Sequence, residues 1–332
     1  MVITLQDRAR GSFIGLAVGD ALGSPTEGKT PDEISSRWGR VIDFLSEDQG
    51  GSDDTEYALF SSKLLLRHKR DLTSQIVADA YRRDIVNAAN SYKGAGFSEM
   101  IAINNLIKGL QPPASGQHLH SWSDGLAMRV APYGITSVGD PHFAAHLAKE
   151  DGLVANAGEG IFSGQVVAAA IAVAMTGASF EQIVQTALEV IPKNSWTASS
   201  ITRGIFIGNS CTDVWSSLKP LHASLACSYY FWPDVAPEAV GLAFGLIAAA
   251  RGKFEDAVLG AVNIGRDTDT IAAIAGAICG ASQGIQVIPE QWTKRISVSQ
   301  GICINAVKNM NIIETADDLA LLAQSQSWSK KP

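Results

Sequence analysis

The stretch TIAAIAGAICGA, residues 270–281, consists almost entirely of alanine, glycine and isoleucine. It lacks the strict apolar–polar alternation of a half-buried strand, and it contains no proline or turn dipeptide, so it predicts a helix. Small side chains at Ala272, Ala273, Gly276 and Gly280 allow the backbone of such a helix to approach its neighbours closely. The stretch therefore predicts a buried helix inside a protein made of several packed helices.

The same kind of pattern recurs along the whole chain. Alternating β-branched runs with Asn-Gly or Asp-Gly turns are scarce, whereas Ala-rich and Leu-rich segments with helical spacing are frequent. Helices are expected at about residues 5–22, 56–70, 73–90, 164–175, 180–190, 237–250, 270–281 and 316–324. No repeat or linker-like composition divides the chain. We predict an all-α, compact multi-helix globule in which residues 1–332 form a single domain.

Two segments are predicted to be loops. Residues 23–51 and 109–152 are rich in Pro, Gly and Ser and show little helical periodicity. Functional side chains are often found on such segments. Gly15, Gly19 and Gly23 recur at every fourth position and lack the G-x-G-x-x-G spacing of a dinucleotide-binding fold, so they predict close helix packing instead.

Composition limits the functions open to this chain. With 46% hydrophobic and 18% charged residues, the 332-residue chain can bury a sizeable core. Its formal net charge of -7 argues against the broad basic surface that nucleic acids and anionic membranes require. We therefore expect a small-molecule or modified-protein substrate, with no nucleic-acid and no membrane partner.

Cysteine spacing and the first residues indicate a cytoplasmic protein. The four cysteines are widely separated and form no C-x-x-C pair, so neither a zinc site nor a disulfide framework is expected. The N-terminal residues MVITLQDRARG carry charges where a signal peptide needs its apolar stretch. Apolar runs are shorter than the ~20 residues that span a bilayer.

Two short acidic stretches precede strongly helical segments. They read GSDDTE at residues 51–56 and GRDTDT at residues 265–270. One explanation is helix capping, because Asp, Ser and Thr accept hydrogen bonds from the free N–H groups of a first turn. Asp53 and Glu56 even have the spacing of a capping box. Capping needs only one such residue per helix, however, and each stretch supplies at least two carboxylates and a hydroxyl.

The excess of acids favours a cation site as the second explanation. Crowded carboxylates repel one another, and hard cations such as Mg²⁺ and Mn²⁺ prefer oxygen ligands. If the two stretches met in space, they could hold two cations ~3.5–4 Å apart, as two-metal hydrolytic sites do. Spacing alone leaves capping and cation binding both open.

Four segments resemble the ordered signatures of the ADP-ribosylglycohydrolase family. They are GLAVGDALGSPTE at residues 15–27, SDDT at 52–55, MRVAP at 128–132 and DTDTIA at 267–272. They occur in the order found in the family, and the similar region extends from about Arg8 to Ala281. The resemblance implies an all-α fold, a dinuclear Mg²⁺ site in which Mn²⁺ could replace Mg²⁺, and removal of ADP-ribose from a protein side chain or related acceptor.

The resemblance also assigns roles to residues. It implies metal ligands at Ser52, Asp53, Asp54, Asp267, Asp269 and Thr270, with Ser52 standing where the family more often has Thr. It implies catalytic roles for Glu27, Asp53, Asp54 and Asp269, with Glu27 beside the metals. In such a site the ribose hydroxyls replace metal-bound waters while a carboxylate moves the proton during attack of water on the anomeric carbon. Which carboxylate moves the proton stays open.

The segments expected to contact substrate depart from the commoner family pattern. The expected contacts are Ser123, Asp124, Gly125, Met128, Asn156, Gly158, Glu159 and Gly160. Asp124 stands where an amide is usual, and an acid there would repel a diphosphate. Asp124 therefore favours a substrate without phosphate at that point, or a side chain turned toward the metals, or simply a solvated loop acid.

Two further departures leave alternatives open. Val154 and Ala155 replace a frequent Thr-His pair, so Asn156 or Glu159 could supply the missing contact, or the glycines there could simply form a turn. Arg266 stands where Gly is common and could neutralise acidic side chains, contact an anionic substrate or face solvent.

Other functions are kept as alternatives. The same scaffold could hydrolyse nucleosides or other N-ribosides, as Asp124 and the absent His suggest. It could also be a non-catalytic binding or structural homologue, but the intact set of acidic residues argues against this. His118 and His120 lack a nearby Cys or third His, so a surface loop is expected there rather than a transition-metal site. No G-x-S-x-G elbow supports a serine nucleophile.

Overall fold

The computed structural model describes residues 3–47, 49–86, 96–325 and 328. This part of the chain contains seventeen α-helices and no strand, which confirms the all-α prediction. The helices are α1 (Leu5–Gly23), α2 (Pro31–Trp38), α3 (Asp53–His68), α4 (Ser74–Ala80), α5 (Phe97–Ile107), α6 (Gly125–Arg129), α7 (Ala131–Thr136), α8 (Pro141–Gly152), α9 (Glu159–Ala174), α10 (Phe180–Leu188), α11 (Trp196–Ser210), α12 (Val214–Leu225), α13 (Ala236–Ala249), α14 (Phe254–Asn263), α15 (Thr268–Gln283), α16 (Glu290–Arg295) and α17 (Ile312–Gln324). A π-helix follows α4 at Tyr81–Val86.

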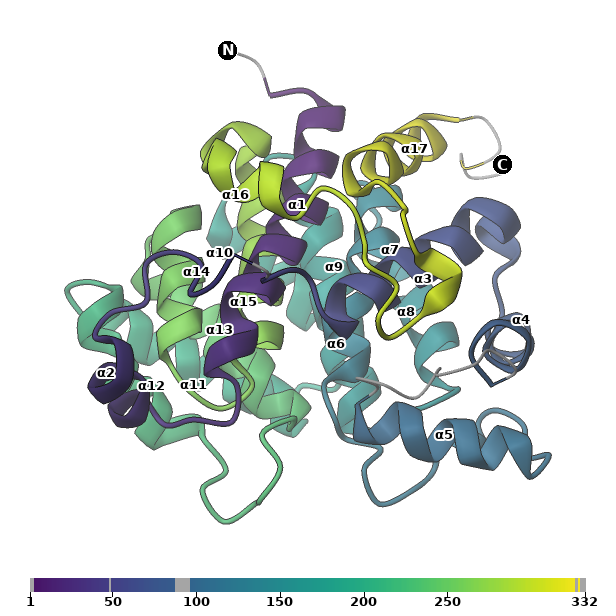
Figure 1. The fold of residues 1–332 in the computed structure, drawn as a ribbon, viewed down its shortest axis with the longest axis horizontal. Helices are drawn as coiled ribbons and strands as arrows, with labels where there is room; N and C mark the ends of the chain where they lie inside the picture. Colours follow the sequence, from purple (N-terminus) through teal and green to yellow (C-terminus); the bar gives the residue numbers. More distant parts are fainter. Residues whose placement is uncertain (1–2, 48, 87–95, 326–327, 329–332) are drawn as a thin grey trace.

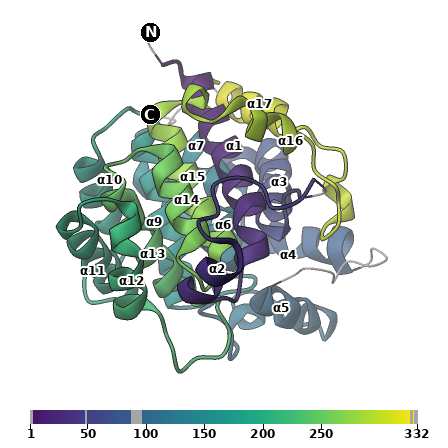
Figure 2. The same cartoon turned by 60° about the vertical axis from the view of Figure 1, so that its left-hand side comes forward.

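Helices α1 and α15 pack side by side through the middle of the molecule (Figures 1 and 2). A Cβ atom added at Gly15 would lie 2.3 Å from the carbonyl oxygen of Gly276, and one added at Gly19 would lie 2.2 Å from that of Ala272. Only residues without side chains permit such an approach of two helix backbones. The close helix packing predicted from these glycines is therefore confirmed.

The antiparallel contact between α1 and α15 places the end of one helix beside the start of the other. Gly11 lies against Gly280, whereas Gly23 lies so close to Asp269 that an added Cβ would be 2.5 Å from its Cα. The loop that follows α1 is thus held next to the first turn of α15.

The remaining helices surround this pair. Helices α9, α13 and α14 pack against α15, while α3, α7 and α17 pack against α1. A continuous hydrophobic core extends from residues of α1 to residues of α17. No helix in the described part of the chain is both long enough and apolar enough to cross a bilayer.

The two segments predicted to be loops contain helices, so that prediction is corrected. Helix α2 lies within residues 23–51, and α6, α7 and α8 lie within residues 109–152. Pro31 and Pro141 stand in the first turns of α2 and α8. A backbone N–H in a first turn has no acceptor within the helix, so proline, which has no N–H, is tolerated there. Thr30 and Asp140 cap the same helices. The prolines therefore mark helix starts rather than loops.

The predicted helices occur with shifted ends. The expected helix at residues 73–90 is α4 followed by the π-helix, and its last four expected residues lie outside the described part of the chain. Helix α3 begins at Asp53, three residues before its expected start, and α9 begins at Glu159, five residues before its own.

Candidate active site

The two acidic stretches predicted from the sequence meet at one cavity of about 510 Å³. The cavity lies between the start of α3, the start of α15, the loop after α1 and the start of α6. Its lining includes Glu27, Ser52, Asp53, Asp54, Ser123, Asp124, Gly125, Met128, Asp234, Asp267, Asp269 and Thr270. A hydrogen bond of 3.4 Å from Thr270 Oγ1 to Asp54 Oδ1 joins the two helix starts directly.

Asp20, near the end of α1, accepts hydrogen bonds from N–H groups at the start of α3. Its carboxylate accepts hydrogen bonds from the Ser52 N–H at 2.8 Å, the Ser52 hydroxyl at 2.6 Å and the Thr55 N–H at 3.0 Å. No side chain of the helix start itself caps α3. The carboxylates of Asp53 and Asp54 are therefore not needed as caps and can face the cavity. Asp20 was missed because, within the first motif, nothing distinguishes it from an ordinary helix residue.

Glu56 does not form the capping box that its spacing with Asp53 suggested. Its buried carboxylate instead accepts hydrogen bonds from the backbone N–H groups of Ile302, Cys303 and Ile304 at 2.7–2.8 Å. These bonds hold the segment near residue 302 against the cavity, where Ile302 and Cys303 form part of the wall. The capping explanation for this acid is therefore wrong.

The start of α15 is also free of side-chain capping. Asp267 is the residue before the first turn, and it makes no capping hydrogen bond. Thr268 instead donates to the Gly23 carbonyl at 2.9 Å, and Thr26 donates to the Thr268 hydroxyl at 3.0 Å. These bonds tie the loop that carries Glu27 to α15. As a result, one carboxylate oxygen each from Glu27, Asp267 and Asp269 lie within 4.8 Å of one another.

These carboxylates fit a cation site. Asp54 Oδ2, Asp124 Oδ2 and Asp269 Oδ1 are buried and accept no hydrogen bond. Among the described residues that line the cavity, none is a lysine, arginine or histidine. Buried oxygens that lack a partner are costly, and a hard divalent cation would satisfy them. The group could therefore hold a metal ion.

Burial and mutual repulsion shift the acidity of the whole group. Burial, followed by the charges of neighbouring acids, raises the pKa of Asp53, Asp54 and Asp267 well above the ordinary value. The negative charge of Asp269, followed by burial, raises the pKa of Glu27 to about 7. Burial raises the pKa of Asp20 to about 6. Carboxyl groups shifted in this way favour protons or cations as partners.

Asp124 is not a solvated loop acid, which corrects one of the three alternatives for this residue. It is 2% exposed and lies within the acidic group beside Asp267. Burial and then the charge of Asp234 raise its pKa well above the ordinary value. Asp234 was missed because it is a single acid in an aromatic segment without a recognisable motif. Burial raises the pKa of Asp234 to about 6.

A buried polar network supports the loop that carries Ser123. The Ser123 hydroxyl donates to Ser98 at 2.5 Å, and the Ser98 hydroxyl donates to Glu99 at 2.7 Å. Glu99 in turn forms a fully buried ion pair with Arg129 at 2.7 Å. A side chain at Gly125 would collide with Glu99, since an added Cβ would lie 2.7 Å from its carboxylate. This network fixes the cavity wall formed by the start of α6.

Four of the expected substrate contacts do not line the acidic cavity, so their positions do not support that expectation. They are Asn156, Gly158, Glu159 and Gly160. Asn156 donates to the Ser123 carbonyl at 3.1 Å, and Gly160 packs against the Ser121 carbonyl. The carboxylate of Glu159 accepts the N–H groups at the start of α11, both at 2.9 Å. Asn156 and Gly160 therefore contact the loop at residues 121–123, and Glu159 holds the start of α11.

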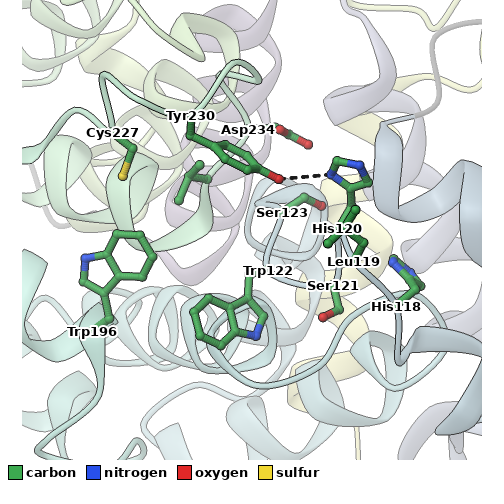
Figure 3. Close-up of a pocket in the computed structure, with 11 residues that line it drawn as sticks. His118, Leu119, His120, Ser121, Trp122, Ser123, Trp196, Cys227, Tyr230 and Asp234 are labelled. Carbon is green, nitrogen blue, oxygen red and sulfur yellow. Dashed lines mark hydrogen bonds between the residues drawn. The ribbon is translucent and has the colours of Figure 1, made fainter.

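A second cavity of about 450 Å³ adjoins the first and shares Ser123 and Asp234 with it. The side chains of Trp122, Trp196 and Tyr230 lie around one space (Figure 3), and the two indole rings are 6.2 Å apart. We call this the aromatic cavity and the first one the acidic cavity.

The two histidines of the aromatic cavity are engaged separately. His118 Nε2 bonds with the Ala155 carbonyl at 2.9 Å, and His120 Nδ1 bonds with the Tyr230 hydroxyl at 3.2 Å. Within the described residues, Glu27, Asp267 and Asp269 are the group of His, Cys, Asp or Glu side chains whose ligand atoms are close enough to share an ion.

Fold and site together define an all-α protein with a buried acidic cavity suited to a divalent cation. The chain belongs to the ADP-ribosylglycohydrolase family, whose model matches residues 1–329. Members of this family hydrolyse glycosyl bonds, so the chain is a glycosyl-bond hydrolase.

Several relatives cover most of the chain. It is 32% identical over 301 residues to an uncharacterized protein of Archaeoglobus fulgidus, covering 87% of this chain and 91% of that one. It is 25% identical to an ADP-ribosylarginine hydrolase of Pseudomonas putida, covering 89% and 76%, and 25% identical to the human ADP-ribosylhydrolase ARH3, covering 86% and 88%. A solved ADP-ribosylglycohydrolase-related protein complex has the same fold, with a TM-score of 0.65, 23% identity and coverage of 96% and 97%.

Proposed function

We propose that residues 1–332 form one domain that hydrolyses ADP-ribosyl bonds with the help of two divalent cations, Mg²⁺ or Mn²⁺. The substrate would be a protein side chain that carries ADP-ribose or a related ADP-ribosyl compound. One observation carries the proposal: two acid-bearing helix starts meet at one cavity, and buried carboxylate oxygens there have no hydrogen-bond partner. Two of the relatives are named as hydrolases of ADP-ribosylated compounds, which agrees with this substrate class.

Both helix starts would contribute ligands. Helix α3 would supply the oxygens of Ser52, Asp53 and Asp54, and α15 would supply those of Asp267, Asp269 and Thr270. When bound, divalent cations would stabilise the negative charge that develops during hydrolysis and would hold hydroxyl groups of the sugar.

Glu27 is the group best placed to move a proton. Unlike Asp267 and Asp269, it is exposed, so water and substrate can reach its carboxylate. The Glu27 carboxylate would accept a proton from an attacking water or return one to the leaving group. Asp53, Asp54 and Asp269 would orient the reacting sugar through the cations they hold.

The aromatic cavity would bind the base of the substrate. The rings of Trp122, Trp196 and Tyr230 offer flat apolar surfaces on which a purine can stack. Ser123 and Asp234 lie at the boundary with the acidic cavity, so a ribose in the acidic cavity and a base in the aromatic cavity would belong to one molecule.

The proposal is tested by measuring release of ADP-ribose. Purified protein is incubated with ADP-ribosylarginine and with an ADP-ribosylated protein, in MgCl₂ or in EDTA. We expect turnover in MgCl₂, loss of turnover in EDTA and recovery when Mg²⁺ is restored. Asp53→Ala and Asp269→Ala should lower kcat about 100-fold or more, because each removes a proposed ligand. Asp256→Ala, at a partly exposed acid on α14, serves as control. Absence of turnover in MgCl₂ on every ADP-ribosyl substrate would reject the proposal.

A second candidate function is hydrolysis of nucleosides or other N-ribosides. It is favoured by Asp124, which lines the acidic cavity, and by Asp234, which lines both cavities, because a diphosphate there would meet negative charge. Release of free base from nucleosides, without turnover of ADP-ribosyl substrates, would support this candidate over the first.

A further inference from the structure

Arg266 lies directly before the acidic start of α15 and has an unusual backbone conformation. Its φ is +67°, in the left-handed region that residues with side chains rarely adopt. The backbone there pairs with the loop that follows α1: the Arg266 N–H donates to the Lys29 carbonyl at 2.9 Å, and the Gly28 N–H donates to the Arg266 carbonyl at 2.8 Å. The main chain of Arg266 thus holds the Glu27 loop beside the metal-ligand stretch.

The side chain of Arg266 points to a different segment. Its guanidinium forms an ion pair with Glu238, with Nε 2.5 Å from Oε1 and Nη2 3.3 Å from Oε2. Nη2 also donates to the Trp232 carbonyl at 3.0 Å. The Glu238 side chain is fully buried, and its Oε2 accepts the Cys227 N–H at 2.6 Å. Arg266 and Glu238 therefore anchor the backbone of the segment 227–235 at two separate points.

The segment 227–235 brings side chains to both cavities. Tyr230 lines the aromatic cavity, and Asp234 lines both cavities. The Asp234 carbonyl accepts the Asp124 N–H at 3.1 Å, so the segment also meets the start of α6. Tyr229 and Phe231 are largely exposed, so hydrophobic burial of these two rings does little to fix the segment. The polar anchors, together with the packing of the Trp232 ring against Phe97 and His120, therefore set its position.

We propose that Arg266 is a positioning residue that sets how tightly the enzyme binds the part of the substrate lying in the aromatic cavity. It acts through Glu238 and the Trp232 carbonyl, which place Tyr230 and Asp234, and it does not touch the reacting atoms. Its charge balances Glu238 rather than the acidic cavity, and it does not face solvent freely. The effect on substrate affinity rests on the proposed function; the effect on the segment does not.

The test replaces Arg266 by glycine, which keeps the left-handed backbone and removes the guanidinium. We expect Arg266→Gly to raise KM for ADP-ribosylarginine about 10-fold or more, because displaced contact residues weaken binding. We expect kcat to stay within about threefold and the Mg²⁺ affinity within about twofold, since the metal ligands keep their places. Hydrogen exchange at the Cys227 and Asp124 amides should become faster than in the unmodified protein, because their acceptors move away.

Two further variants separate positioning from stability. Arg251→Gly is the matched control, because Arg251 also has a positive φ and its guanidinium also binds a backbone carbonyl, that of Cys211, outside both cavities. It should leave KM unchanged. The double variant Arg266→Gly with Glu238→Gln removes the unpaired buried carboxylate, so it should fold stably and still show the raised KM.

The proposal is overturned if the double variant regains the original KM, if kcat or Mg²⁺ affinity is lost while KM is unchanged, or if exchange in residues 227–235 stays unaltered in Arg266→Gly. If the unmodified protein hydrolyses no ADP-ribosyl compound, the proposed function fails separately. In that case faster exchange confined to residues 227–235 still supports the positioning role, and unaltered exchange refutes it.

Discussion

Replacing Asp269 by asparagine should make the metal-free protein more stable while removing its response to Mg²⁺. Asp269 is 5% exposed, and its Oδ1 accepts no hydrogen bond. A carboxylate oxygen of Asp269 lies within 4.8 Å of oxygens of Glu27 and Asp267. Asparagine has nearly the same shape and carries no charge, so the substitution removes electrostatic repulsion and leaves the packing in place.

The size of the gain follows from Coulomb's law. Two unit charges 4.8 Å apart repel by about 3.5 kcal/mol at an effective dielectric constant of about 20. Proton uptake relieves part of this repulsion, because the pKa of Asp267 is raised well above its usual value and the pKa of Glu27 is raised to about 7. We therefore expect a net gain of about 1–3 kcal/mol at pH 8. For a chain of 332 residues, that is about 1–4 °C in Tm.

Thermal unfolding with EDTA and with MgCl₂ measures both effects. The unmodified protein should gain stability in MgCl₂, by about 2.7 kcal/mol when free Mg²⁺ is 100 times its Kd. Asp269→Asn should unfold at a higher temperature than the unmodified protein in EDTA and respond little to MgCl₂. Asp256→Asn, outside the cavity, should leave the Mg²⁺ response intact. A lower Tm of Asp269→Asn in EDTA would show that this carboxylate stabilises the fold by itself, and the reasoning would be refuted.

Three further outcomes are expected. Folding raises the pKa of Asp20 and Asp234 to about 6 and of Glu27 to about 7, so the folded metal-free protein binds more protons than the unfolded chain between about pH 4 and 7. Its denaturation midpoint in EDTA should therefore fall as pH rises from about 5 to about 7, and a rising midpoint would contradict this. Gly15→Ala should destabilise the protein by about 2 kcal/mol in urea titrations, since the added methyl would overlap the Gly276 carbonyl. An unchanged midpoint would show that the contact between α1 and α15 accommodates the methyl group without cost. Glu56→Gln should cost about 1–3 kcal/mol, measured in the same way, because its amide N–H₂ would face backbone N–H donors near Cys303; equal stability would show that these hydrogen bonds are dispensable.

The acidic stretches could be found from the sequence, but the residues that organise them could not. Asp53 and Asp269 stand out because acids and hydroxyls are crowded before helices. Asp20 and Glu56 carry the same side-chain chemistry, yet they bind backbone groups in other parts of the chain. Which acid binds main-chain N–H groups and which faces the cavity depends on contacts between distant segments, and local spacing does not encode these.

The all-α class was predictable from local sequence, whereas the helices within the two segments predicted to be loops were not. The Ala-rich runs of α9, α13 and α15 show their conformation through composition alone. Helices α2 and α8 are short and begin with proline, so the residue that starts each helix was interpreted as a loop signal. Asp234 gave no local signal either, since its position depends on anchors supplied by Arg266 and Glu238.

The contact between α1 and α15 has a consequence for the growing polypeptide. Asp54 and Thr270, which join the two halves of the acidic cavity, are 216 residues apart in the chain. Before α15 has left the ribosome, the face of α1 that carries its glycines has no helix packed against it. The acidic cavity then has the carboxylates of α3 but lacks those of α15. A nascent chain ending before residue 268 therefore cannot hold cations between α3 and α15.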